Sequence, residues 1–493
     1  MKKQNKKESP LNWWKHQIKQ VAFWLIAILI LLSIYLLYQI WMVNVLPIKY
    51  FVPVVLLLIL VNFAMWWLQY GKKVNKLNQR LGQGLIVVFA IVLALGNRYL
   101  YQARDALSKM SNTDEYEMIS VIVKKENTAK ELEDIKDGSF AVANTIDKEN
   151  TDLTINDINQ ELETQIQTKS YENLNKMADA LYGDEVDAMI LNEAYRSLLD
   201  EEHASFNEDT KVIYTFKIKK KATNIGSKVD VTKDPFNVYI SGIDTYGPIA
   251  TKSRSDVNMI ATINPETRQV LLTSIPRDYY ISQTCQKNEK DKLTHTGIFG
   301  VDCTVTSMEQ FTGLTINYYA RVNFSSLESI VDAIGGIDVY NEVGFYSGVD
   351  GSFIPAGDVH MDGSTALKFA RERHAYAAGD RQRGRNQMIV LSAIIDKATS
   401  PAIVTGYSSI MSAVGDTFQT NMDADEMMSL VKKQLDEGGG WNIVQQSVDG
   451  AGENGVWSPA NQTYSYMMYP NMESVEAAIV KIKDVMHGEQ IAQ

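Results

Sequence analysis

Cysteines and nucleotide-binding or hydrolase motifs are scarce in this 493-residue sequence. It contains only Cys285 and Cys303, and no CxxC or Cys/His cluster, which argues against a structural zinc site. No G-x-S-x-G, Walker A or Rossmann glycine pattern stands in a supporting context. With 45% hydrophobic and 22% charged residues, the chain is not wholly disordered or collagen-like, and its length predicts two or three domains.

The two cysteines leave two interpretations open. If Cys285 and Cys303 lie outside the cell, they could form a disulfide, because oxidising compartments preserve such bonds. The bond would close a short loop and contribute about 3 kcal/mol on the chain-entropy model. Two free thiols are the alternative.

Acidic residues are almost absent from the first 110 positions, which hold 14 Lys and Arg against 2 Asp and Glu. The remaining residues hold 34 basic against 57 acidic side chains, a net charge of -23. A basic, apolar head on an acidic body predicts a membrane anchor with a soluble part. The acidic body argues against general nucleic-acid binding, which needs a basic face.

Charge is also absent from Val21 to Ile40, a run long enough to span a bilayer. A second run covers Ile48 to Leu68. Leu81 to Tyr101 is weaker, because its continuous apolar stretch is only Leu85 to Leu95, and a buried soluble helix is the alternative there. We predict an anchor over residues 1–101 with three membrane helices, at about 20–41, 48–69 and 81–101.

Basic residues predict the orientation of this anchor. They gather before the first span and between the second and third: Lys2, Lys3, Lys6, Lys7, Lys15, Lys19, Lys72, Lys73, Lys76 and Arg80. The positive-inside rule then places the N-terminus and the 71–80 loop in the cytoplasm. Three spans place the C-terminal domains outside, as in a multi-pass cell membrane protein. Two spans would leave them in the cytoplasm.

The soluble part divides into two regions joined by a polar linker at 222–235. Residues 102–221 are predicted to form a small α+β accessory domain, in which we find no catalytic constellation. Its strands are expected at 118–123, 140–144, 187–191 and 211–219, and its helices at 153–166 and 171–181.

Residues 236–485 are predicted to form the main domain. Strand patterns cover 236–243, 257–263 and 269–275, and helical patterns cover 325–334, 364–372 and 386–398. This mixture predicts an α/β fold, a three-layer α/β/α sandwich with a mixed central sheet.

Two acidic residues stand at predicted strand ends in this domain. Asp244 ends one strand, and Asp256 lies just before the next. Ligands of open α/β sheets bind at strand ends. Two carboxylates placed there could hold Mg²⁺, which takes few protein ligands. An Asp in a turn is the simpler interpretation for either residue alone.

Arginines form the other cluster. Arg277 directly follows the 269–275 strand, and five more lie within fifteen positions: Arg371, Arg373, Arg381, Arg383 and Arg385. The guanidinium fork makes paired bonds to phosphate oxygens. Asp380 could cap the helix that follows, whose N-terminus also suits an anion. A surface charge run is the alternative, but together with the acids the cluster favours a site for a pyrophosphate and a metal ion.

His295 and His374 are candidates for proton transfer. For both, a hydrogen-bonded structural or surface histidine is the simpler interpretation.

Five motifs occur in an order that resembles the LytR–CpsA–Psr family of cell-wall glycopolymer ligases: GIDTY, RSDVNMIATIN, LLTSIPRDYY, ALKFARERH and GDRQRGRNQ. The three spans and the acidic accessory region resemble the capsule-associated CpsA branch of this family. The resemblance is strongest over residues 236–400.

The resemblance implies an extracellular phosphotransferase that moves capsular polysaccharide or a related glycopolymer from a polyprenyl-diphosphate carrier to a peptidoglycan hydroxyl. It implies Mg²⁺, with Mn²⁺ as an alternative, at Asp244 and Asp256. The implied partners are the carrier-linked polymer, peptidoglycan, membrane lipid and proteins of capsule export or assembly.

The resemblance also assigns the arginines. Those that match the pyrophosphate clamp are Arg254, Arg277, Arg371, Arg373 and Arg383. Arg381 and Arg385 fall in the same cluster. Asp380 and Gln387 match an acid and an amide that orient it. We expect the catalytic group to comprise Asp256, Arg277, Arg383 and Asp244. Many relatives carry a tandem Gln where this sequence has Asn386 and Gln387, so the role of Asn386 is open.

Two other functions compete with the ligase. One is a membrane-bound regulator of capsule transcription that senses polyprenyl phosphates. The predicted cytoplasmic segments are too short for a helix-turn-helix domain, although a two-span topology would revive this reading. The other is a binding module that performs no chemistry. A pyrophosphatase side activity is compatible with the same groups.

Overall fold

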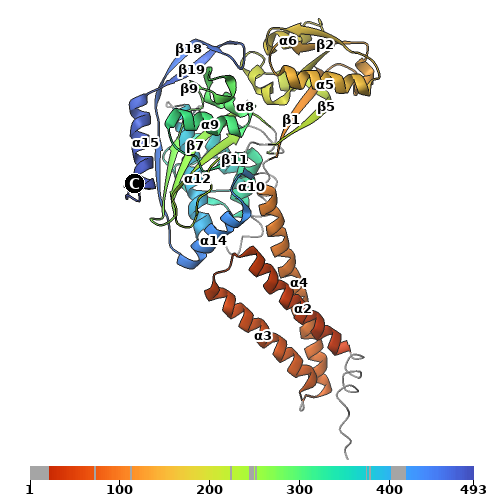
Figure 1. The fold of residues 1–493 in the computed structure, drawn as a ribbon, viewed down its shortest axis with the longest axis vertical. Coiled ribbons are helices and arrows are strands. Elements are labelled where there is room, and N and C mark those ends of the chain that lie inside the picture. Colours follow the sequence, from red (N-terminus) through yellow and green to blue (C-terminus); the bar gives the residue numbers. More distant parts are fainter. Residues whose placement is uncertain are drawn as a thin grey trace, which may run out of the picture. The chain divides into compact units, whose positions relative to one another are not determined.

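The computed structural model in Figure 1 describes most of the chain, namely residues 21–71, 74–111, 114–221, 225–243, 249, 252–373, 375–376, 379–400 and 418–492. The chain divides into two compact units. One comprises the chain up to Leu107 together with Ala424–Gly439. The other comprises Ser108–Asp423 and the chain from Gly440 onward, and it contains the strands.

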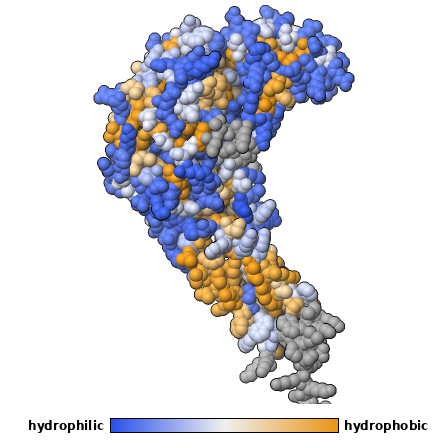
Figure 2. Space-filling model, viewed as in Figure 1, coloured by the Kyte–Doolittle hydropathy of each residue, from blue (hydrophilic) through white to orange (hydrophobic). Residues whose placement is uncertain are grey.

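Three helices of the first unit are long and apolar enough to cross a membrane, as predicted: α2 (Val21–Val43), α3 (Ile48–Tyr70) and α4 (Lys76–Met110). Their exposed apolar side chains form the orange band over these helices in Figure 2. Exposing such an apolar surface to water is unfavourable, whereas the hydrocarbon core of a bilayer is equally apolar.

Helix α4 has 35 residues and extends beyond the predicted span at both ends. Asn97 shows why polar residues do not end it. Its Nδ2 donates to the Leu93 carbonyl, 2.9 Å away, so the amide N–H bonds within the helix and does not interrupt it.

Helix α14 (Ala424–Glu437) belongs to the same unit. Lys49 Nζ lies 3.0 Å from Asp436 Oδ1, and Lys432 Nζ donates to Asn44 Oδ1 at 2.8 Å. Asn44 and Lys49 flank the turn between α2 and α3. This turn therefore lies on the same side of the anchor as α14.

The accessory domain (residues 114–221) has a mixed five-stranded sheet in the order β3-β2-β4-β1-β5. Its strands are β1 (Asp114–Lys124), β2 (Ser139–Ala143), β3 (Gln167–Tyr171), β4 (Ala188–Asn192) and β5 (Thr210–Lys221). Helices α5 (Lys148–Glu161) and α6 (Leu174–Tyr182) pack with it around two apolar clusters. The predicted α+β architecture is confirmed.

Strand β3 was not predicted. Its sequence QTKSY lacks apolar alternation, because it is an edge strand whose residues are almost all exposed. The predicted helix at 171–181 begins later, at Leu174, because the Asn173 side chain caps it by accepting from the Lys176 backbone N–H.

The main domain (residues 236–492) has a six-stranded sheet in the order β16-β11-β6-β7-β8-β17. The strands are β6 (Phe236–Ile243), β7 (Ser255–Asn264), β8 (Gln269–Ser274), β11 (Tyr318–Asn323), β16 (Phe418–Thr420) and β17 (Asn442–Ser447). Strand β6 pairs with β11 in parallel and with β7 antiparallel, so the sheet is mixed, as predicted.

Alternating side chains of the central strands serve two cores. Ile260 and Leu271 pack on one face with α9 (Val301–Thr312) and α15 (Met472–Met486). Met259 and Leu272 pack on the other face with α12 (Asp380–Thr399). A sheet buried on both faces by helices is the predicted three-layer α/β/α sandwich.

Cys285 and Cys303 form a disulfide that joins a short 3-10 turn to α9. Their separation of 18 residues makes a small closed loop. Of the two interpretations left open by the sequence, the structure shows the disulfide.

We expect the double variant Cys285→Ser/Cys303→Ser to lose about 3 kcal/mol in the free energy of unfolding, because its unfolded state regains the entropy of the open loop. Denaturant unfolding of the purified chain, with and without reductant, measures this loss. Reductant should destabilise the parent and leave the double variant unchanged. A parent that is insensitive to reductant while its thiols become reactive would contradict the prediction.

Candidate active site

Asp256 is the second residue of β7 and the centre of the candidate site. Its Oδ1 is held by Arg277 Nη1 at 3.0 Å and by Thr294 Oγ1 at 2.9 Å. Its Oδ2 is buried and has no hydrogen-bond partner among the residues that the structure describes. A buried carboxylate oxygen without a donor is costly unless a cation lies against it.

The pKa of Asp256 reflects two opposing effects. Burial raises this pKa, but the guanidiniums of Arg277, Arg254 and Arg383 outweigh burial and hold it at about 2. The carboxylate therefore remains ionised at every physiological pH. A group with so low a pKa is a poor general base and a good counter-ion or metal ligand.

Backbone packing brings these arginines together. Arg277 follows β8, and its carbonyl accepts from the Thr294 N–H at 2.8 Å. Arg383 lies in the first turn of α12, next to Gly384. A Cβ at Gly384 would lie 2.9 Å from Ser274 Oγ, so α12 approaches the end of β8 closely. Strand end and helix start thereby place Arg277 and Arg383 on the same carboxylate.

A cavity of about 490 Å³ opens beside Arg277. Its other lining residues are Arg254, Asp278, Lys292, Thr294, Arg381, Gly450, Gly452, Tyr466 and Met468. The cavity has four cationic side chains against one carboxylate, which suits a multiply charged anion such as pyrophosphate.

Arg381 lines this cavity from α12. Its Nη2 lies 2.6 Å from Asp449 Oδ1, just before the hairpin formed by β18 (Gly450–Ser458) and β19 (Thr463–Pro470). The hairpin supplies an aromatic wall. A Cβ at Gly452 would overlap the Tyr466 ring, at 2.6 Å from its Cε2, so the missing side chain makes room for the ring.

The remaining predicted residues are distributed as follows. Arg371 ends α11 (Gly363–Arg371) and stacks on Phe324, with its Cζ 4.1 Å from the ring centre. Arg385 is exposed on α12. Within the described part of the chain, Arg371, Arg373 and Gln387 are not among the residues that line the cavity. Their assignment to the pyrophosphate clamp stays a prediction.

The N-cap position of α12 is held by Gly379, and Asp380 is the first residue of the helix, so Asp380 does not take the capping position that the sequence predicted. Asp244 and His374 lie outside the described residues. His295 is buried and its Nδ1 lies 3.0 Å from Asp291 Oδ1, which supports the structural interpretation for this histidine.

Asn386 has a clear structural role. Its Nδ2 donates to the Phe369 carbonyl of α11, and its Oδ1 accepts from Gln382, both at 3.0 Å. The buried amide thus ties α12, which carries Arg381 and Arg383, to α11.

Sequence reasoning missed Lys292, Thr294 and the hairpin wall. Lys292 and Thr294 precede His295, but they reach the site through the fold around β9 (Tyr280–Ser282) and β10 (Lys290–Lys292), which no pattern indicated. The alternating tyrosines of TYSYMMY were the only sequence signal for the aromatic wall.

The chain thus combines three candidate membrane helices with an α/β/α sandwich, in which a buried carboxylate lies among arginines beside a cationic cavity. Residues 196–479, more than half of the chain, match the LytR_cpsA_psr family, and the chain belongs to this family. The resemblance of its motifs is confirmed.

Two curated relatives are named polyisoprenyl-teichoic acid–peptidoglycan teichoic acid transferase TagU. The Bacillus anthracis protein is 36% identical over 215 residues, which cover 43% of this chain and 69% of that one. The Enterococcus faecalis protein is 33% identical over 214 residues, 43% of this chain and 68% of that one. The crystal structure of Bacillus subtilis TagV aligns with a TM-score of 0.44 at 25% identity, over 52% of this chain and 99% of that one.

The low pKa of Asp256 gives a testable pH dependence. Between its ordinary value of 3.8 and about 2, the unfolded chain binds more protons at this group than the folded chain. The stabilising contribution of Asp256 is therefore complete above pH 4 and lost as the pH falls towards 2. We expect the stability difference between the parent and Asp256→Asn to shrink over this window in denaturant unfolding.

The control is Asp152→Asn, which changes an exposed acid on α5 of the accessory domain, far from Asp256 in the sequence. Its stability difference from the parent should stay nearly constant with pH. A constant difference for Asp256→Asn as well would contradict the ionised, arginine-held carboxylate.

Proposed function

We propose that this chain is a membrane-anchored phosphotransferase that moves a glycopolymer from a polyprenyl-diphosphate carrier to a hydroxyl of peptidoglycan. The observation that carries the proposal is the ionised Asp256 among three arginines, beside a cavity with four cationic side chains. The names of the family's teichoic acid transferases support it. Capsular polysaccharide or a related glycopolymer is the proposed cargo.

The geometry suits displacement at phosphorus. The acceptor hydroxyl oxygen bonds to the phosphorus that carries the glycopolymer, and its proton ends on the leaving phosphate. The bond from this phosphorus to the bridging oxygen breaks, and the polyprenyl phosphate leaves with the electron pair. Arg254, Arg277, Arg381 and Lys292 neutralise the charge that develops on the leaving phosphate.

Asp256 serves this reaction mainly by holding Arg277. The bond to Oδ1 fixes one end of the guanidinium at 3.0 Å. Thr294, bonded to the same oxygen, fixes the carboxylate in turn. Preorganised charges of this kind stabilise a transition state without rearranging as it forms.

We further propose a Mg²⁺ site at Asp256, with Mn²⁺ as an alternative ion. The ionised carboxylate and its buried Oδ2, which has no donor among the described residues, fit a hard cation. Asp244 is the proposed second ligand. When bound, the ion would supply charge neutralisation at a phosphoryl oxygen.

The proposed site is extracellular. The charges flanking the three apolar helices support a cytoplasmic N-terminus. The turn between α2 and α3 lies on the side of α14, as three crossings require if α14 and the strands follow the third. The disulfide between Cys285 and Cys303 also favours an oxidising compartment.

In cells, we expect Asp256→Ala to move the polymer from the wall into the medium, because carrier-linked polymer can no longer be attached. The measurement quantifies polymer bound to purified walls and polymer released, with transcripts of the polymer-synthesis genes from the same cultures. Loss of the carboxylate at the centre of the site should reduce wall-bound polymer at least tenfold.

Protein abundance in the membrane fraction and the Asp152→Ala variant are the controls for folding. A fall in transcripts at an unchanged ratio of wall-bound to released polymer would contradict the ligase and indicate a regulator. Unchanged wall attachment by a folded Asp256→Ala protein would refute the role of Asp256.

The aromatic wall suggests where a sugar lies. Tyr466 lines the cavity together with the cationic groups and is 38% exposed. An aromatic ring with a polar tip suits the apolar face and hydroxyl edge of a saccharide. We propose that Tyr466 contacts the sugar next to the reacting phosphate.

We expect Tyr466→Ala to slow transfer from a purified carrier substrate about tenfold, equivalent to about 1.4 kcal/mol. Binding of inorganic pyrophosphate should stay unchanged, because the cationic groups remain. Tyr466→Phe should keep most of the rate. The matched control is Tyr464→Ala, on the same strand face but outside the described cavity lining, where it packs against Trp457. Equal losses for both alanine variants would contradict a specific contact.

A further inference from the structure

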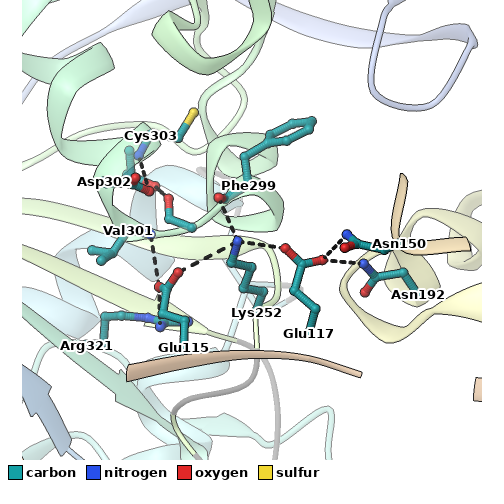
Figure 3. A network of polar contacts seen from close by, with 12 residues as sticks. Glu115, Glu117, Asn150, Asn192, Lys252, Phe299, Val301, Asp302, Cys303 and Arg321 are labelled. Atoms are coloured by element: carbon teal, nitrogen blue, oxygen red, sulfur yellow. Dashed lines mark hydrogen bonds and ion pairs between the residues drawn. The ribbon is translucent and has the colours of Figure 1, made fainter. Parts of the chain in front are cut away.

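Two glutamates of the accessory domain reach into the main domain. Glu115 and Glu117 lie on β1, and Figure 3 shows them on either side of Lys252. Lys252 Nζ lies 3.0 Å from Glu117 Oε1 and 3.7 Å from Glu115 Oε2. The same ammonium donates to the Phe299 carbonyl at 3.1 Å. All three charged side chains are buried or nearly so, with exposed fractions of 10% for Lys252, 4% for Glu115 and 11% for Glu117.

The far side of each glutamate is also occupied. Arg321 Nη1 donates to Glu115 Oε1 at 3.1 Å, from β11 of the main domain. Asn150 and Asn192 of the accessory domain donate to Glu117 Oε2 at 2.8 Å and 2.7 Å. Hydrogen bonds within the accessory domain therefore hold the Glu117 side chain in the position from which it contacts Lys252.

Lys252 is close to the candidate active site along the chain. It precedes Arg254 by two residues and Asp256 by four. The intervening backbone packs directly on Gly297, where a Cβ would lie 2.4 Å from the Ser253 carbonyl oxygen. Gly297 and Phe299 both belong to α8 (Thr296–Phe299). The segment is thus held against α8 by backbone contact and by the bond from Lys252.

We propose that Lys252 is a positioning residue, through which Glu115 and Glu117 of the accessory domain set the place of the segment that carries Arg254 and Asp256. This inference rests on the proposed function. It gives the accessory domain a role in transfer although it supplies no residue to the described cavity lining.

A buried ion pair is an inefficient way to hold two domains together if attachment is its only role. Desolvating two charges costs several kcal/mol, and apolar contacts of similar volume often hold surfaces together better. Around Glu117 the cost is evident, because burial, with the charge of Glu117 added, raises the pKa of nearby Asp147 to about 6. Unlike apolar contacts, the hydrogen bonds and ion pairs of this network are directional, because each of them fixes the position of a particular atom.

The test compares Lys252→Met with Arg321→Met in the full-length protein. Both variants remove one buried cation that contacts Glu115, but Arg321 stands on β11 and not on the active-site segment. We expect Lys252→Met to lower the transfer rate of folded protein at least tenfold, because small misplacements of catalytic groups have such effects. Arg321→Met should keep the rate within about twofold, at a similar loss of thermal stability.

Two readouts separate positioning from stability. Hydrogen exchange of amides 253–256 should accelerate at least tenfold in Lys252→Met and change little in Arg321→Met. Lys252→Arg should restore most of the transfer rate, because it keeps the charge and a donor. If Lys252→Met does not fold, Glu117→Gln, which keeps the shape of the side chain, should show the same exchange and rate changes more weakly.

The inference is overturned if Lys252→Met and Arg321→Met lower the rate equally, or if exchange at 253–256 is unchanged in the former. Parent protein and Asp256→Ala are assayed alongside. An inactive parent, or an Asp256→Ala variant as active as the parent, would instead contradict the proposed function. An active parent with an inactive Asp256→Ala variant leaves the proposed function standing whatever the Lys252 result.

Discussion

The attraction between one buried carboxylate and three guanidiniums determines how the candidate site is built. Burial alone would raise the pKa of Asp256, and the arginines would repel one another if Asp256 were absent. Each partner comes from a different element: the approach to β7, the exit of β8 and the start of α12. The sandwich must therefore bring three chain segments to one point, and the close contact at Gly384 and the amide of Asn386 serve this end.

Much of this arrangement was predictable from the sequence. Apolar runs predicted the three membrane helices, and short, largely apolar segments predicted β6, β7 and β8, because a strand buried on both faces is apolar along most of its length. The resemblance singled out Asp256, Arg254, Arg277 and Arg383, which the structure places together. The edge strand β3 was not predicted, because an exposed strand needs no apolar pattern. The roles of Lys292 and Tyr466 were not predicted. Both residues reach the cavity through strand pairings between separate segments, which the pattern of a single sequence does not reveal.

The accessory domain illustrates the same limit. Acidic side chains are usually exposed, yet Glu115 and Glu117 are buried against Lys252 and Arg321. The alternation of β1 places both glutamates on one side of the strand, but only the partner domain makes that side an interior. A charged residue in a sequence is therefore not by itself evidence of an exposed side chain, because a neighbouring domain can bury it.

Gly297 has a consequence for how this protein could diversify. Backbone touches backbone there, so main-chain contact contributes to the location of Arg254 independently of the cavity side chains. The hairpin wall is different, because it presents surface side chains on β18 and β19. If the hairpin contacts the sugar as proposed, changes to its side chains would alter the polymer that is accepted, while the backbone contact at Gly297 would stay the same.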